Sequence, residues 1–215
     1  MSRFDLHSSD FIEKKFVLDM YNQIADHFSD TRYCIWNMVK NFLIDKSENE
    51  YGLEIGCGNG KNLLINPKLN IIGLDNSIEL LTICKKKKLN VVEGNCCNLP
   101  FNNNQFNYIM SIAVFHHLYT EKRRIIAINE MIRVLKQFGK GIISMWSFEN
   151  QEKRKFSLGN NIVTWIRKSD NKTFNRYYYI YNYDDIIQLF NQIENIKIDQ
   201  IYNEYGNWVI EFTKL

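Results

Sequence analysis

Three glycines at alternate positions follow a short apolar run in the stretch LEIGCGNGKN, residues 53–62. Glycine has no Cβ atom, so a backbone that contains it can turn sharply and approach a ligand closely. The spacing is Gly-x-Gly-x-Gly, whereas the dinucleotide-binding fingerprint places its third glycine one position later. A Gly-Lys-Ser or Gly-Lys-Thr phosphate-binding loop is also excluded, since Asn62 follows Lys61. The loop therefore favours a ligand without a pyrophosphate group.

An acidic residue, Asp75, ends the next apolar run, LNIIGLD (69–75). A carboxylate at the tip of the second strand can accept hydrogen bonds from both ribose hydroxyls of a nucleoside. The stretch GNCCNLPF (94–101) follows the third apolar run, and its Asn95 could contact an adenine edge. Together these features predict a nucleoside ligand without a pyrophosphate, and S-adenosylmethionine is such a ligand. The alternative is a tight turn beside a solvated acid.

Two adjacent histidines, His116 and His117, stand in SIAVFHHLYTEKRR (111–124), between an apolar run and a basic one. They could be metal ligands, general bases or packing residues. Adjacent histidines tend to point in different directions, and no cysteine or acid nearby completes a metal site. No Cys-x-x-Cys pair occurs among the five cysteines, which are Cys34, Cys57, Cys84, Cys96 and Cys97. We therefore expect reduced, mostly buried thiols and no metal site in this chain.

Strand-like and helix-like segments alternate along the chain, and they must position these side chains. Apolar runs occur at 51–56, 69–75, 89–94, 106–114 and 139–146, and helical spacing occurs at 11–28, 31–43, 77–87 and 121–136. Continuous apolar runs between helices predict a parallel sheet with helices on both faces. The end of the chain, 196–215, predicts two strands with a turn near Gly206. We expect an α/β fold with a doubly wound, mainly parallel, Rossmann-like sheet of seven strands and a C-terminal antiparallel hairpin.

The length of 215 residues and the 45% hydrophobic content suit one well-buried domain. Its expected parts are an N-terminal helical cap (1–48), a ligand-binding core (49–146), a loop (147–172) and substrate-side strands (173–215). No apolar run approaches the roughly 18 residues of a membrane helix. The N-terminus lacks the apolar segment of a signal peptide. We expect no membrane contact, and a location in the cytoplasm or also the nucleus.

The net charge of +3 says little about partners, but its distribution is uneven. Residues 151–180 carry seven Lys or Arg against two acids. A local basic segment of this kind is either a contact for an anion or nucleic acid, or a solvated loop.

The order EIGCGNGK, GLDNS, GNCCNLPF, FNYIMS and EMIRVLKQFGKGIISMW resembles the class I S-adenosylmethionine-dependent methyltransferases. A narrower resemblance is to the tRNA wobble-uridine methyltransferases, and it rests on YNQIADHFSDTRYCIW, SIAVFHHL, RYYYIY and GNWVIEF. Those enzymes methylate the carboxylate of 5-carboxymethyluridine to give the methoxycarbonylmethyl ester. The resemblance implies S-adenosylmethionine as cofactor, S-adenosylhomocysteine as its product, tRNA as substrate and a small zinc-binding activator subunit as partner. Asn95 departs from the aspartate that is usual in the superfamily.

The resemblance also implies the residues of the site. The expected cofactor contacts are Glu54, Gly56, Cys57, Gly58, Gly60, Asp75, Asn76, Asn95, Cys96 and Ser111. The expected holders of the acceptor carboxylate are Arg32, His116 and Arg176, and further substrate contacts are Tyr33, His117, Trp146, Tyr177 and Tyr178. We expect His116 to face the pocket and His117 to pack or hydrogen-bond behind it. Ordinary packing or surface ion pairs are the alternatives for the arginines and aromatic residues.

A carboxylate acceptor needs no general base, because a carboxylic acid with a pKa of about 4 is already ionised at neutral pH. Methyl transfer from a sulfonium is an in-line displacement, so alignment and a dry site are the main requirements. Two other functions remain open from the sequence. One is a methyltransferase for a small-molecule acceptor such as a lipid, quinone or metabolite. The other is a binding module without catalysis, against which the intact glycines and Asp75 argue.

Overall fold

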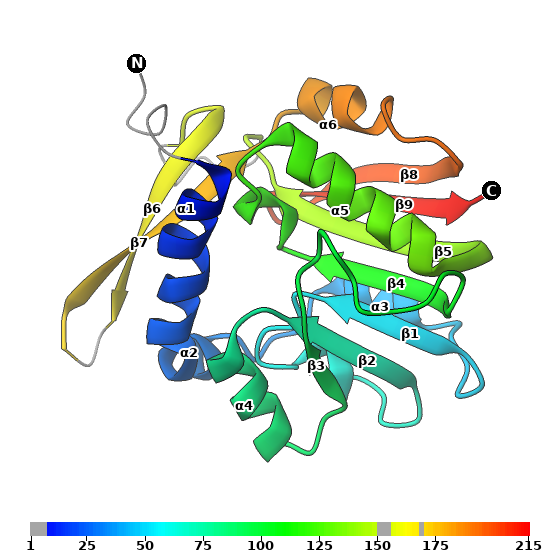
Figure 1. Ribbon diagram of the computed structural model, residues 1–215, viewed down its shortest axis with the longest axis horizontal. Helices are drawn as coiled ribbons and strands as arrows, with labels where there is room; N and C mark the ends of the chain where they lie inside the picture. The colour runs from blue at the N-terminus through cyan, green and yellow to red at the C-terminus, as the bar shows by residue number, and fades with distance from the viewer. Residues whose placement is uncertain (1–7, 150–155, 168–169) are drawn as a thin grey trace.

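A seven-stranded sheet forms the centre of the computed structural model, which describes residues 8–149, 156–167 and 170–215 (Figure 1). The strand order is β3-β2-β1-β4-β5-β9-β8. Five strands are parallel: β1 (Tyr51–Ile55), β2 (Asn70–Asp75), β3 (Val91–Glu93), β4 (Phe106–Ile112) and β5 (Leu135–Trp146). The last two, β8 (Ile196–Glu204) and β9 (Asn207–Lys214), form the antiparallel hairpin at one edge. The predicted fold class is confirmed, including the turn near Gly206.

Helices cover both faces of the sheet, because the side chains of each strand alternate between the two faces. On β4, Ile109 packs in a core with α5 (Glu121–Val134) and α6 (Tyr183–Phe190). Its neighbours Tyr108 and Met110 pack on the other side with α3 (Asn37–Leu43) and α4 (Ile78–Lys86). The fold therefore has three layers, and Figure 1 shows α5 in front of the sheet. None of the helices in the described ranges is long and apolar enough to cross a membrane.

The N-terminal helical segment continues from α1 (Ser9–Glu13) through a π-helical turn, η1 (Lys14–Leu18), into α2 (Asp19–Thr31). A π-helical turn is often found at a functional site. The second predicted helix, 31–43, is shorter than expected: α2 ends at Thr31 and α3 begins only at Asn37. Beside α1 and α2 lies a separate hairpin of β6 (Gly159–Arg167) and β7 (Lys172–Ile180) (Figure 1).

Strand β6 corrects the prediction of a loop over 147–172. Its residues alternate between exposed and half-buried, so the stretch NNIVTWIR lacks the continuous apolar run of the buried parallel strands. Pairing with β7 supplies its backbone hydrogen bonds instead. Residues 150–155 and 168–169 of the predicted loop lie outside the described residues.

The order of the central strands reverses between β1 and β4, since β2 and β3 lie on one side of β1 and β4 and β5 on the other. Ligands of doubly wound sheets bind at such a reversal, outside the carboxyl ends of the strands. Two short 3₁₀ helices follow these ends, η2 (Asn62–Leu64) after β1 and η3 (Phe115–His117) after β4. The fold thus brings the glycine stretch, Asp75 and the two histidines to one edge.

One glycine in the sheet is required by packing. A Cβ atom added to Gly141 of β5 would lie 2.1 Å from the Phe212 ring of β9. We expect Gly141→Ala to lower the free energy of unfolding by about 1–3 kcal/mol, the usual effect of overpacking. Urea denaturation measures the change. Combined with Phe212→Leu, which opens space, Gly141→Ala should cost less than it does alone; strictly additive losses would contradict this account.

Candidate active site at the carboxyl edge of the sheet

A cavity of about 1180 Å³ opens at the carboxyl edge of the sheet. Its walls come from the ends of β1, β2, β4 and β5, from α1 and α2, and from β7. Pockets for one small ligand usually have volumes of about 300–1000 Å³. The cavity therefore has room for a cofactor and part of a second molecule.

The glycine loop after β1 forms the floor of this cavity. Gly56 has a φ of +69°, and a Cβ atom there would lie 2.2 Å from Val114, so only glycine fits. The backbone N–H of Gly58 donates to Asp75 Oδ2 at 2.8 Å, and the N–H of Ser77 donates to Oδ1 at 2.9 Å. Burial raises the pKa of Asp75, while these backbone donors lower it. Each carboxylate oxygen has a second lone pair, which leaves acceptors for a ligand.

A second carboxylate, Glu54 at the end of β1, is almost fully buried on the cavity wall. Its Oε1 accepts a 2.6 Å hydrogen bond from Asn62 Nδ2. Its Oε2 and the Oδ1 of Asn62 are buried without a hydrogen-bond partner. Burial raises the pKa of Glu54 to about 8. Two buried oxygens without hydrogen-bond partners suit a ligand that brings a cationic donor group, beside which the Glu54 carboxyl would ionise and accept.

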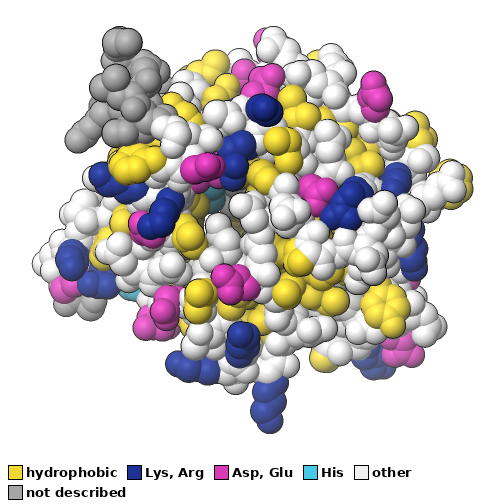
Figure 2. All heavy atoms as spheres, in the orientation of Figure 1, with side chains coloured by type: hydrophobic (Ala, Val, Ile, Leu, Met, Phe, Trp, Pro, Cys, Tyr) yellow, Lys and Arg dark blue, Asp and Glu magenta, His cyan; other side chains and the backbone are white. Residues whose placement is uncertain are grey.

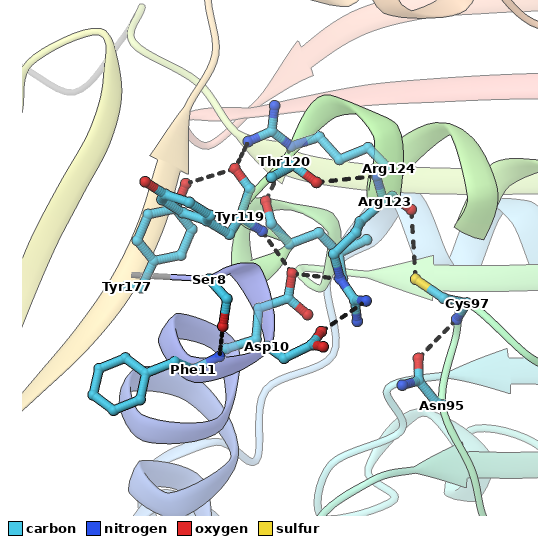
Figure 3. Close-up of polar contacts among 12 residues, drawn as sticks. Ser8, Asp10, Phe11, Asn95, Cys97, Tyr119, Thr120, Arg123, Arg124 and Tyr177 are labelled. Carbon is cyan, nitrogen blue, oxygen red and sulfur yellow. Dashed lines mark hydrogen bonds and ion pairs between the residues drawn. The ribbon is translucent and has the colours of Figure 1, made fainter. Parts of the chain in front are cut away.

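These features fit S-adenosylmethionine, the cofactor expected from the sequence. Its amino acid part carries an ammonium group that Glu54 and Asn62 could accept from, and its ribose carries two hydroxyls for Asp75. Eight of the ten predicted cofactor residues line the cavity: Glu54, Gly56, Cys57, Gly58, Asp75, Asn76, Asn95 and Cys96. The side chain of Asn95 accepts a hydrogen bond from the backbone of Cys97 at 2.8 Å (Figure 3).

Two predicted cofactor residues do not line the cavity. A Cβ atom on Gly60 would meet Leu89 at 2.3 Å and Cys84 at 2.9 Å, so this glycine allows close packing of α4 and its loop rather than ligand contact. Ser111 is fully buried in β4, and its hydroxyl donates to the carbonyl of Ile55 at 3.4 Å. The predicted cofactor contacts of Gly60 and Ser111 are therefore not supported by the cavity lining.

Both adjacent histidines line the cavity, yet their surroundings differ. His117 is held at both ring nitrogens: Nδ1 lies 2.9 Å from the carbonyl oxygen of Tyr177, and Nε2 lies 2.9 Å from the hydroxyl of Tyr21. His116 accepts from the backbone N–H of Trp146 at Nδ1, 3.3 Å away, and its ring stacks on Tyr178. Burial lowers the pKa of His117 to about 3 and that of His116 well below its usual value. Both rings are therefore neutral at neutral pH.

Arg176 of β7 is buried on the cavity wall, with 4% of its surface exposed. Its guanidinium lies over the rings of Trp165 and Tyr178, at 4.7 and 5.1 Å from their centres. Its Nη1 donates to the Tyr21 hydroxyl at 3.5 Å, and its Nε has no hydrogen-bond partner. No Asp or Glu of the described ranges forms an ion pair with it. A buried positive charge thus faces the cavity without an acid beside it.

Strand parity decides which β7 side chains reach the cavity. Arg176 and Tyr178 line it, and Tyr177 between them points to the opposite side, because successive residues of a strand face opposite ways. Tyr177 is fully buried against Ile12 of α1, and its hydroxyl donates to Asn160 at 2.7 Å. Its predicted contact with substrate is therefore not supported by the cavity lining.

The remaining predicted substrate residues divide between cavity and surface. Arg32, at the end of α2, lines the cavity, and its guanidinium lies 5.1 Å from the centre of the Trp165 ring. Trp146, at the end of β5, lines it too, with its ring centre 4.3 Å from that of Tyr178. Tyr33 follows Arg32 on the surface, 81% exposed, and does not line the cavity. The loop after α2 turns it outward, so its predicted place in the site is not supported.

Sequence reasoning missed several cavity residues on α2 and the glycine loop. Tyr21 and Phe28 of α2 line the cavity seven residues apart, the spacing of one helix face. Asn59 of the loop donates to the carbonyl oxygens of Ser29 and Arg32, at 3.3 and 3.0 Å, and so holds the C-terminal end of α2. The periodicity of 11–28 predicted the helix but gave no reason to separate its cavity face from its core face.

The N-terminal helix is fastened over the cavity by ion pairs with the start of α5. The Glu13 carboxylate accepts from the Tyr119 backbone and from Arg123 Nε, both at 2.8 Å. Asp10 pairs with the same arginine at 3.3 Å. Figure 3 shows Asp10 and Arg123 reaching toward each other between the two helices. Burial raises the pKa of Glu13 although these donors lower it.

The face of the molecule seen in Figure 2 carries a mixture of charges. Figure 2 shows Lys and Arg interspersed with Asp and Glu around a hollowed part of one face, with no field of one charge. Among the described residues, no three His, Cys, Asp or Glu side chains lie close enough together to hold a metal ion.

Known proteins resemble this chain in sequence and fold. A model of the methyltransferase domain matches residues 53–143. The chain is 31% identical over 220 residues to the tRNA (carboxymethyluridine(34)-5-O)-methyltransferase of Schizosaccharomyces pombe, covering 92% of this chain and 96% of that protein. It is 28% identical over 260 residues to the tRNA (carboxymethyluridine(34)-5-O)-methyltransferase alkbh8 of Xenopus tropicalis, covering 95% of this chain and spanning 41% of that relative's length.

Among solved structures, the complex of the Haloferax volcanii Trm112 methyltransferase activator with a methyltransferase contains a similar chain. The TM-score is 0.68 at 14% identity, covering 92% of this chain and 97% of that one. A likeness at this identity concerns the fold alone.

Glu54 provides a test of the cofactor site. With a pKa of about 8, Glu54 is mostly protonated at pH 7 in the free protein. A cationic group beside it lowers its pKa, so binding of S-adenosylhomocysteine at pH 7 should release about one proton. Calorimetry in buffers of different ionisation enthalpy measures the number of protons. Release should vanish in Glu54→Gln and persist in Glu79→Gln, an exposed acid on α4; equal release in all three proteins would exclude Glu54 as its source.

Proposed function

Since this chain belongs to the family of tRNA (carboxymethyluridine(34)-5-O)-methyltransferases, we propose that it methylates the carboxylate of 5-carboxymethyluridine at position 34 of tRNA. The methyl donor is S-adenosylmethionine, for which the glycine loop, Asp75 and Glu54 offer fitting partners. The product is the methyl ester at the anticodon wobble position.

The buried Arg176 is the observation that carries this proposal. A charge taken out of water is strongly unfavourable unless an opposite charge or hydrogen bonds compensate it. The described chain supplies two aromatic faces and a tyrosine hydroxyl to Arg176, but no carboxylate. An acceptor that brings its own carboxylate into the cavity would supply that partner. A neutral hydroxyl or amine acceptor would not.

The reaction requires the residues of this chain to bind and orient the acceptor, but not to activate it. S-adenosylmethionine, when bound, supplies a methyl group already activated by its sulfonium charge. The acceptor carboxylate is ionised at neutral pH, so no residue has to remove a proton. Arg176 holds and orients the carboxylate. His116 is neutral, and with Nδ1 accepting from Trp146 its proton lies on Nε2, where it can donate one hydrogen bond.

The aromatic wall of the cavity would position the nucleoside. Tyr178 stacks on His116 with their planes 14° apart and packs against Trp146. Flat rings of this kind offer stacking surfaces for a base of single-stranded RNA, such as one in an anticodon loop. They also exclude water from the reacting groups, which strengthens the interaction between Arg176 and a carboxylate.

We further propose a small zinc-binding activator protein as partner. Its support is the family resemblance and the fold shared with the Haloferax volcanii chain that was solved with the Trm112 activator. Any zinc would be held by that partner, since the described residues of this chain offer no cluster of metal ligands.

Transfer of a radiolabelled methyl group to tRNA tests the proposed function. The substrate is tRNA that carries 5-carboxymethyluridine without the ester, with and without an activator subunit. We expect label that is released by mild alkali, because the product is an ester. Transfer to a small-molecule acceptor but not to this tRNA under either condition would overturn the proposal.

Substitution of Arg176 should affect catalysis and the free energy of unfolding in different ways. We expect Arg176→Met to reduce kcat/KM for the tRNA about 100-fold, since a hydrogen bond to a charged group contributes about 1.5–3 kcal/mol. The free energy of unfolding should stay equal or rise, because an uncompensated buried charge is removed. The affinity for S-adenosylhomocysteine should not change.

Arg124 of α5 provides the matched control for this substitution. It is buried to the same extent, but its guanidinium donates to the carbonyls of Leu118 and Tyr119 and lies 3.8 Å from the centre of the Tyr179 ring. Arg124→Met should therefore lower the free energy of unfolding. If Arg176→Met retains transfer or destabilises the fold as strongly as Arg124→Met, the assigned role of Arg176 is wrong.

A further inference from the structure

Tyr21 of α2 lies at the centre of the polar contacts in the acceptor wall, defined as His116, His117, Trp146, Arg176 and Tyr178. Its hydroxyl lies 2.9 Å from His117 Nε2, 3.3 Å from the Tyr178 hydroxyl and 3.5 Å from Arg176 Nη1. Three side chains from η3 and β7 thus share one oxygen atom from the N-terminal helix. Its ring packs edge-on against His117 and Phe28.

The direction of each hydrogen bond in this cluster follows from chemistry. The carbonyl of Tyr177 can only accept, so the proton of His117 is on Nδ1. In the neutral ring Nε2 is then an acceptor, and Tyr21 donates its only hydroxyl proton to it. Tyr21 has only lone pairs left for its other two partners. The Tyr178 hydroxyl and Arg176 Nη1 must therefore both donate to Tyr21.

This order has a consequence for the acceptor. The Tyr178 hydroxyl donates its proton to Tyr21. This hydrogen bond holds the Tyr178 ring against His116 and Trp146. One end of the Arg176 guanidinium is directed to Tyr21, and its Nε is left without a partner. A lone pair of Tyr21 thus orients the Arg176 guanidinium and leaves its positive charge uncompensated. A carboxylate in the same place would neutralise that charge.

The helix that carries Tyr21 is also fastened to the cofactor loop. The Ser77 hydroxyl after β2 donates to Asn22 Oδ1 at 2.6 Å. Asn59 of the glycine loop holds the far end of the helix at Ser29. The Phe28 ring lies 3.5 Å from where a Cβ atom of Gly58 would be. One face of α2 therefore connects the acceptor wall to the floor on which the cofactor is expected.

We infer that Tyr21 is a positioning residue for the carboxylate acceptor: its hydroxyl orients Arg176 and Tyr178 and fixes them relative to the cofactor loop. This inference rests on the proposed function. Tyr21 itself need not touch the reacting atoms, because its hydroxyl already donates to His117 and accepts from Tyr178 and Arg176.

Binding of two synthetic anticodon stem-loops tests this role. One carries 5-carboxymethyluridine at position 34 and the other an unmodified uridine, so the ratio of their affinities isolates recognition of the carboxylate. We expect Tyr21→Phe, which keeps the ring and deletes the hydroxyl, to reduce this ratio about tenfold and to reduce kcat/KM for methyl transfer similarly. The affinity for S-adenosylhomocysteine should stay within about twofold of wild type.

A double-mutant cycle shows whether Tyr21 acts through the arginine. In the Arg176→Met background, Tyr21→Phe should have almost no further effect on the ratio, because the group that it orients is absent. A residue with only a structural role would give additive effects, and additivity would overturn the inference. Unchanged discrimination in Tyr21→Phe would overturn it as well.

Two further variants keep the test decisive. Tyr202→Phe removes a hydroxyl that donates to Glu211 on the far hairpin, and it should change neither ratio nor rate. His117→Asn disturbs the acceptor of the Tyr21 proton and should also reduce the ratio; it replaces Tyr21→Phe if that variant does not fold. A wild-type protein that neither prefers nor methylates the carboxymethyluridine stem-loop overturns the proposed function instead.

Discussion

A buried positive charge, Arg176, with no negative partner among the described residues is the constraint that organises the cavity of this protein. Removing a guanidinium from water is costly, and proteins usually compensate the charge with a carboxylate. Here the compensation around Arg176 comes from the faces of Trp165 and Tyr178 and from one tyrosine hydroxyl. Such neutral partners keep the cation in place and leave its charge available. These surroundings of Arg176 favour a ligand that brings a negative charge.

His116 and His117, which lie beside Arg176, add no further positive charge to the wall. A second positive charge in the wall would repel Arg176, and burial keeps both rings neutral at physiological pH. The cavity therefore has a buried cation, Arg176, in the acceptor wall and two acidic residues, Glu54 and Asp75, at the cofactor floor, of which Glu54 becomes ionised when a cationic group lies beside it. This separation of charge suits a cationic cofactor and an anionic acceptor that must lie in contact while reacting.

The sequence predicted those parts of the candidate site whose residues stand close together along the chain. The glycine loop and Asp75 are local features, and their meeting at the sheet edge follows from parallel strands. The expected cofactor contacts of Gly60 and Ser111 are not supported by the cavity lining, because sequence does not show whether a glycine of the loop or a serine of β4 faces the ligand or the core. For β7 the sequence does not decide whether Tyr177 or Tyr178 faces the cavity, because strand parity says only that the two point to opposite sides.

Tyr21 was missed for a different reason. Helical spacing places Tyr21 and Phe28 on one face, but it cannot say that this face closes a cavity formed by strands much later in the chain. The contacts that define its role, with His117 and Tyr178, span 96 and 157 residues. Only tertiary structure reveals partners at such separation.

This separation has a consequence for biosynthesis. A ribosome releases the chain from its N-terminus, so α2, the glycine loop and Asp75 are all available before β7 exists. The acceptor wall cannot assemble until Tyr178 has emerged and its hydroxyl reaches Tyr21. Contacts between distant parts of a chain form slowly because closing a long loop is entropically unfavourable. A nascent chain therefore acquires the elements of its cofactor site first, and its ability to select an acceptor is completed last.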